Sequence, residues 1–122
     1  MEGRSQALRE RQPMANPLTY AKLNQAESMI VLTTGHLPQE EVETVETLLA
    51  RREINGANAH REWFVISAGY TYDGAEYDPL AKVSNDVPVL NSLASEARKT
   101  GVRWLMFDAD VTPTDGLTVY GR

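Results

Sequence analysis

The chain has 122 residues, a net charge of −5 and no cysteine. This length suits a single domain with one modest hydrophobic core, and the lack of cysteine excludes a disulfide framework and a thiolate metal site. The negative charge lies in residues 29–122, which argues against direct contact with nucleic acid, because phosphate binding requires clustered lysine and arginine. The same charge permits binding to a basic protein surface, although acidity also serves solubility alone.

The N-terminal residues lack the features of a targeting or membrane segment. Residues 1–13 are polar and charged, and no apolar run in the sequence approaches the roughly 18 residues that span a bilayer. Asn16 followed by Pro17 is typical of a helix start and predicts a short helix over residues 17–26. We therefore expect a cytoplasmic protein with an N-terminal extension, residues 1–28, ahead of a single α/β domain, residues 29–122.

The first half of this domain predicts a strand followed by a helix. Residues 29–34 are continuously apolar and β-branched, which is typical of a strand buried at the centre of a sheet. Residues 38–52 repeat apolar side chains at helical spacing, and Asn55 and Gly56 provide a stop. The same helix carries a run of acidic side chains that fits either a solvated face or an acidic recognition face: Glu40, Glu41, Glu43 and Glu46.

A second strand, a turn and a second helix come next. Residues 63–67 form an aromatic and β-branched run that predicts a strand, with an extension to residue 72 as the alternative. Asp73 and Gly74 are a strong turn signal. Apolar side chains at helical spacing then predict a helix that starts at Asp86, as its N-cap, and closes at Gly101.

The final third of the chain predicts two more strands, and the order of all the predicted elements then indicates the fold class. Residues 102–107 form the third predicted strand, and residues 117–120 predict a short C-terminal strand at a sheet edge. Strands alternating with helices favour an α/β fold with a small sheet of three to four strands, mainly parallel or mixed, and two main helices. If helices cover both faces, Trp104 should be largely buried with its indole N–H paired. The apolar edge strand leaves a homodimer open as an alternative.

A candidate catalytic or metal site lies where two predicted strands end. His36 follows the first strand, and Asp108 and Asp110 follow the third. Parallel neighbours would bring an imidazole and two carboxylates to one sheet edge, where they can bind a divalent cation or perform acid–base chemistry. The alternative is that the two aspartates only end the strand, while His36 makes a loop hydrogen bond. The sequence contains no phosphate-binding glycine loop, nucleophile elbow or His/Cys cluster, so no cofactor is expected.

A second candidate site is the tyrosine-rich stretch around the predicted turn. Tyrosine is common at protein interfaces because it supplies contact area with a hydrogen-bonding tip. The competing interpretation is a hairpin whose tyrosines pack onto the edge of the domain. The residues of the candidate partner-binding surface are Tyr70, Tyr72, Asp73, Glu76, Tyr77 and Asp78.

The chain also resembles a family of uncharacterised small proteins carried on bacterial plasmids, integrative elements and phages. The resemblance covers residues 29–121. The chain differs from the family pattern at Leu37, where threonine or serine is usual, and in the aromatic and acidic insertion at residues 70–78. The likeness rests on four segments: residues 33–37, 63–65, 104–110 and 117–120.

The resemblance implies a mobile-element setting rather than an activity. By analogy with small acidic proteins in that setting, we expect a non-enzymatic protein that binds a protein partner, such as a basic nucleic-acid-binding complex. In this interpretation it inhibits a bacterial defence system, CRISPR or restriction. The alternative is a small metal-dependent or acid–base enzyme that uses His36, Asp108 and Asp110.

Overall fold

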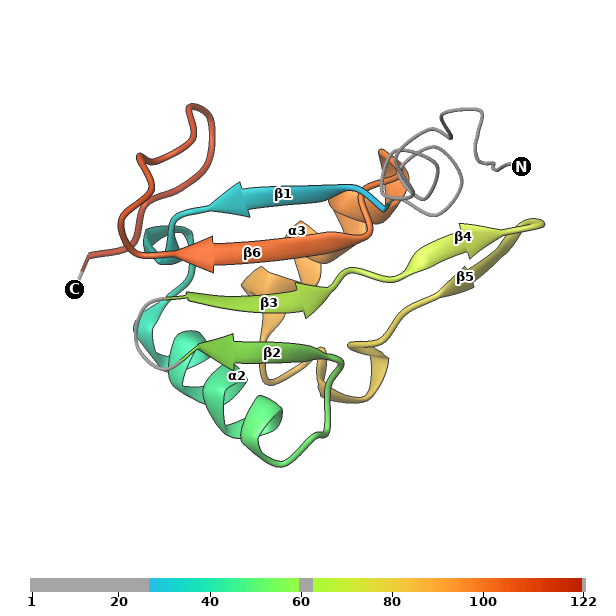
Figure 1. Ribbon diagram of the computed structural model, residues 1–122, viewed down its shortest axis with the longest axis horizontal. Helices are drawn as coiled ribbons and strands as arrows, with labels where there is room; N and C mark the ends of the chain where they lie inside the picture. Colours follow the sequence, from blue (N-terminus) through green and yellow to red (C-terminus); the bar gives the residue numbers. More distant parts are fainter. Residues whose placement is uncertain (1–26, 60–62, 122) are drawn as a thin grey trace, which may run out of the picture.

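The computed structural model describes residues 27–59 and 63–121, which form a mixed four-stranded sheet, two helices and a separate hairpin (Figure 1). This is the small α/β fold that the sequence predicts. The sheet order is β1-β6-β3-β2. The sheet strands are Met29–Leu32 (β1), Gly56–Ala59 (β2), Trp63–Ser67 (β3) and Trp104–Asp108 (β6). The other elements are the helices Gln39–Ala50 (α2) and Pro88–Lys99 (α3), the one-turn helices Thr34–His36 (η1) and Ala81–Val83 (η2), and the hairpin strands Tyr70–Tyr72 (β4) and Ala75–Tyr77 (β5).

Strand β1 lies at an edge of the sheet, so the prediction of a central position is wrong. It runs parallel to β6, while β3 runs antiparallel to both β6 and β2. Only Leu32 of β1 is buried, whereas Met29, Ile30 and Val31 are 46%, 40% and 44% exposed. An apolar run predicts a strand but does not set the strand order. Strand β6 takes the interior position instead, with β1 on one side and β3 on the other.

The helices cover one face of the sheet only, so the expected two-sided covering is wrong. In Figure 1 both α2 and α3 lie behind the sheet, because the two helical connections pass on the same side of it. Along β6, Leu105 and Phe107 are buried, while the alternating Trp104 is only partly buried. The Trp104 indole N–H does find an acceptor, since it donates to Glu27 Oε1 at 2.7 Å.

The hydrophobic core fills the space between the helices and the covered face. Phe64 of β3 packs against Phe107 of β6, with ring centroids 5.4 Å apart. Both helices turn an apolar stripe toward these rings, as their periodicity predicts. Within the part of the chain that the structure describes, no helix is long and apolar enough to cross a bilayer. The helix residues of the core are Val42, Val45, Leu48 and Leu49 from α2, and Leu90, Ala94 and Ala97 from α3.

The N-terminus of α3 is capped by a side chain from α2. The N-cap residue is Val87, not the predicted Asp86, and it makes no side-chain cap bond. Glu41, only 4% exposed, accepts hydrogen bonds from the main-chain N–H groups of Val89 and Leu90, both at 2.9 Å. A carboxylate there satisfies two unpaired donors and meets the positive end of the helix dipole. Glu41 therefore ties the helices together and does not belong to a solvated acidic face.

Strand β2 was not predicted, because its sequence lacks the β-branched and aromatic residues that signal a strand. Its pairing with β3 defines it, with Gly56 opposite Ile66 and Ala59 opposite Trp63. A Cβ at Gly56 would lie 2.0 Å from the Val65 carbonyl oxygen. The glycine interpreted as a helix stop therefore permits the close approach of two strands.

The predicted C-terminal edge strand, residues 117–120, is not formed. The segment is held instead by the Tyr120 N–H, which donates to the Gly35 carbonyl oxygen at 2.8 Å, and by a 2.8 Å bond between the His36 ring and the Thr118 carbonyl oxygen. These partners belong to the one-turn helix η1. A helical turn offers no extended ladder with which a strand could pair.

Candidate protein-binding hairpin

The predicted turn at Asp73 and Gly74 is confirmed, and it joins a hairpin that projects beyond the end of the four-stranded sheet (Figure 1). The two turn residues have φ values of +51° and +78°. Positive φ at both central residues is what a two-residue type I′ turn requires. The strand predicted over residues 63–67 is confirmed as β3, but it does not continue to residue 72, because the chain leaves the main sheet after Ser67 and residues 70–72 form β4.

The hairpin presents three tyrosines on one face, which we call the tyrosine face: Tyr70, Tyr72 and Tyr77. Tyr70 lies opposite Tyr77, and Tyr72 lies two residues further along opposite Ala75, so the three side chains point the same way. The rings of Tyr70 and Tyr77 are 5.2 Å apart. The Arg103 guanidinium lies 4.3 Å from the Tyr70 ring centroid, a cation–π contact. The exposed fractions are 39% for Tyr70, 76% for Tyr72 and 47% for Tyr77.

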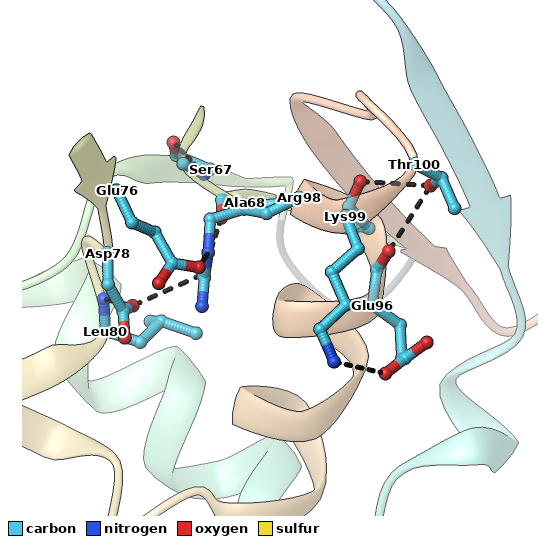
Figure 2. Close-up of polar contacts among 11 residues, drawn as sticks. Ser67, Ala68, Glu76, Asp78, Leu80, Glu96, Arg98, Lys99 and Thr100 are labelled. Carbon is cyan, nitrogen blue, oxygen red and sulfur yellow. Dashed lines mark hydrogen bonds and ion pairs between the residues drawn. The ribbon is translucent and has the colours of Figure 1, made fainter. Parts of the chain in front are cut away.

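A buried arginine holds the root of the hairpin to the body of the domain. The Arg98 side chain, 4% exposed, donates from Nε to Glu76 Oε2 at 2.8 Å and from Nη1 to the Ala68 carbonyl oxygen at 2.8 Å. Nη1 also lies 3.4 Å from Asp78 Oδ1, which itself accepts from the Leu80 N–H. Figure 2 shows this guanidinium between the segments that enter and leave the hairpin. Because one planar group binds both segments, it fixes the hairpin against α3.

The chain turns out of the main sheet at Gly69. This residue has a φ of +84°, and a Cβ built on it would lie 2.1 Å from the Tyr77 carbonyl oxygen and 2.7 Å from Pro79 Cδ. Only glycine fits a position that combines this φ with so close an approach. Neither Gly69 nor Arg98 was among the predicted site residues. A glycine between a β-prone run and the first tyrosine was the one local signal of the bend.

The candidate partner-binding residues therefore separate into two groups. The tyrosine face and Asp73 at the turn are exposed and available to a partner. Glu76 and Asp78 are engaged by Arg98, so they shape the hairpin instead of offering unpaired acceptors. The hairpin projects beyond the sheet and leaves Tyr72 76% exposed, while the Tyr70 ring still contacts Arg103 at the edge of the domain.

His36 lies in η1 with both ring nitrogens engaged. The residue is 1% exposed, and its Nδ1 lies 2.8 Å from the Thr118 carbonyl oxygen. Its Nε2 accepts the main-chain N–H of Thr114 at 2.9 Å. A carbonyl only accepts and an N–H only donates, so these partners select the tautomer with the proton on Nδ1. The ring joins the C-terminal segment to η1, and neither nitrogen is left over for a metal ion or a substrate.

Strands β1 and β6 are parallel neighbours, the condition on which the candidate catalytic site depends, and their ends lie at one sheet edge. Asp108 ends β6, and its Oδ1 accepts the Asp110 N–H at 2.9 Å, which closes a tight turn after the strand. Among the residues that the structure describes, no three His, Asp or Glu side chains gather closely enough to hold a metal ion. The proposed catalytic roles of His36, Asp108 and Asp110 stay predictions without support from the local geometry.

Comparison with known proteins identifies a family but no activity. Neither the curated proteins nor the solved structures contain a significant match to the chain. Residues 29–122 match the family model described as "Family of unknown function (DUF5983) C-terminal domain". The matched range begins at the first residue of β1 and includes the sheet, both helices and the hairpin. The chain therefore belongs to this family of unknown function, DUF5983, through its C-terminal domain.

Proposed function

We propose that the chain is a non-enzymatic binding protein that contacts a protein partner through the tyrosine face. The observation that carries this proposal is a projecting hairpin with three tyrosines that are 39–76% exposed, on a root held by the buried Arg98. A surface fixed before binding loses little conformational entropy when it is covered, and tyrosine has few rotamers to lose. Exposed aromatic rings held in this way are typical of binding surfaces.

The partner is a basic protein surface. Residues 29–122 carry the acidic excess of the chain, and the exposed Asp73 places a carboxylate at the hairpin tip. An acidic protein attracts a basic partner over several ångströms and accelerates their encounter, an effect that salt weakens. In the mobile-element setting that the sequence resemblance implies, such a partner is a nucleic-acid-binding complex of a bacterial defence system, CRISPR or restriction.

The partner contact is tested with the full chain as bait in bacterial lysate, followed by affinity measurement with the purified partner. Tyr72→Ala should weaken binding about 30-fold or more if this tyrosine is an interface anchor, because such residues contribute about 2 kcal/mol. Val119→Ala is the matched control, since Val119 is also exposed (56%) but lies outside the hairpin. Equal affinity for both variants, or no stoichiometric partner for the wild-type chain, would contradict the proposal.

The defence role is tested separately in cells. Expression of the wild-type chain should restore phage plating on a host with an active CRISPR or restriction system, and Tyr72→Ala should abolish the effect. Val119→Ala should act like the wild type. Unchanged plating across hosts with different defence systems would remove the inhibitor role, even if a partner had been found.

A further inference from the structure

The exposed large apolar side chains of the described residues form two groups. One is the tyrosine face. The other lies at β1 and beside its end, and consists of Met29, Ile30, Val31 and Val119, which are 40–56% exposed. Val119 adjoins β1 because its Cγ1 lies 3.7 Å from the place where a Cβ would stand on Gly35, just after the strand. The hairpin does not account for this second surface.

Strand β1 also presents a sheet edge with unpaired main-chain groups. Among the described strands it pairs with β6 alone. The Ser28 carbonyl oxygen accepts from the Trp104 N–H at 3.1 Å. Alternate residues of a strand direct their main-chain groups to opposite sides, so those of Met29 and Val31 point away from β6. Proteins commonly guard such edges with lysine or proline, and β1, with the sequence MIVL, has neither.

We propose that β1 pairs antiparallel with β1 of a second copy of this chain, about a two-fold axis that passes beside Ile30. Ile30 then faces Ile30 of the second copy, and Met29 faces Val31 of the second copy. The outward main-chain groups of Met29 and Val31 are those that such a register joins by hydrogen bonds. The product is one continuous sheet in which the helices of both copies lie on the same face.

A second copy fits this edge because the strand is complementary to itself. The residues around the axis, 29–31, are all apolar and Leu32 faces the uncharged Ser28, so two chains of charge −5 meet along β1 without like charges face to face. The nearest charged group, Glu27, is already paired with Arg103 at 3.3 Å. The open face of the sheet carries an in-register row of apolar side chains that reaches the axis: Ala57, Val65, Met106 and Val31. A symmetric contact continues this apolar surface into the second copy.

The register is tested by disulfide cross-linking of the full chain. Because the protein has no cysteine, each variant carries one thiol. In the proposed register the Ile30 Cα atoms lie about 4.5 Å apart, which a disulfide can bridge. The Met29 Cα atoms of the two copies are diagonal neighbours across the strand pair. They lie about 7–8 Å apart, a separation that a disulfide cannot bridge. Under mild oxidation Ile30→Cys should give a covalent dimer, whereas the equally accessible Met29→Cys should remain mostly monomeric.

Self-association is tested by light scattering over a range of concentrations. The wild-type chain should form dimers. Ile30→Lys should raise the dissociation constant of the dimer about tenfold or more, because the substituted lysines of the two copies face each other at the axis and repel. Circular dichroism of Ile30→Lys verifies that the variant is folded. Tyr72→Ala should leave the dimer intact, which separates this contact from the tyrosine face.

Three results would overturn the proposal. One is a wild-type chain that stays monomeric at every concentration, which would mean that another occupant, such as a foreign strand, covers β1 or that nothing does. The second is equal cross-linking of Ile30→Cys and Met29→Cys, which would exclude the proposed register. The third is a dimer that survives Ile30→Lys and dissociates with Tyr72→Ala, which would place the contact on the hairpin.

Discussion

Replacing Arg98 with methionine tests whether the buried guanidinium holds the hairpin. Methionine keeps the aliphatic stem and removes the donors to Ala68, Glu76 and Asp78. The Ala68 carbonyl then loses its partner in a buried environment, which costs about 1–3 kcal/mol. Loss of the ion pairs to Glu76 and Asp78 lowers the free energy of unfolding by less. Their side chains are 52% and 28% exposed, respectively, so water can solvate the freed carboxylates. We expect the free energy of unfolding to fall by about 2–4 kcal/mol in total.

Urea denaturation followed by tryptophan fluorescence measures this loss, and limited proteolysis at the Asp73 turn reports on the hairpin itself. Lys99→Met is the matched control, because Lys99 is the next residue but is 65% exposed, with one ion pair, to Glu96, at 3.3 Å. It should change the free energy of unfolding by no more than about 0.5 kcal/mol. If Arg98→Met is as stable as Lys99→Met and its turn is no more sensitive to protease, the guanidinium does not hold the hairpin.

Three further substitutions test individual contacts. Glu41→Ala should lower the free energy of unfolding by about 1–3 kcal/mol in chemical denaturation, because it leaves two helix donors unpaired, whereas the exposed Glu40→Ala should change it by less than about 0.5 kcal/mol. Gly69→Ala should lower the melting temperature, because the new Cβ would lie 2.1 Å from a main-chain oxygen at positive φ; an unchanged melting temperature would mean that the bend relaxes freely. His36→Phe should accelerate amide hydrogen exchange at Thr114, with the core amides still protected, and unchanged exchange would show that the ring does not hold the C-terminal segment.

The sequence by itself determined the elements whose signals are local. Both main helices appear where the apolar periodicity predicts them, and Gly101, with a φ of +82°, closes α3, whereas the helix predicted over residues 17–26 lies outside the described residues. The turn at Asp73 and Gly74 was also predictable, because positive φ at two successive residues restricts which amino acids can occupy it. The tyrosine-rich stretch predicts a contact surface from its composition alone, because tyrosine is typical of protein interfaces.

The tertiary structure decided everything that depends on a partner distant in the sequence. Glu41 looks like part of an acidic helix face until α3 places two N–H groups 2.9 Å from its carboxylate. Arg98 looks like an ordinary C-terminal helix cation until the hairpin places Glu76 beside it. Strand β2 has no β-prone residues of its own and exists because β3 pairs with it. Hydrophobic periodicity records which face of an element is apolar, but strand order and the pairing of buried charges arise only when elements far apart in the chain pack together.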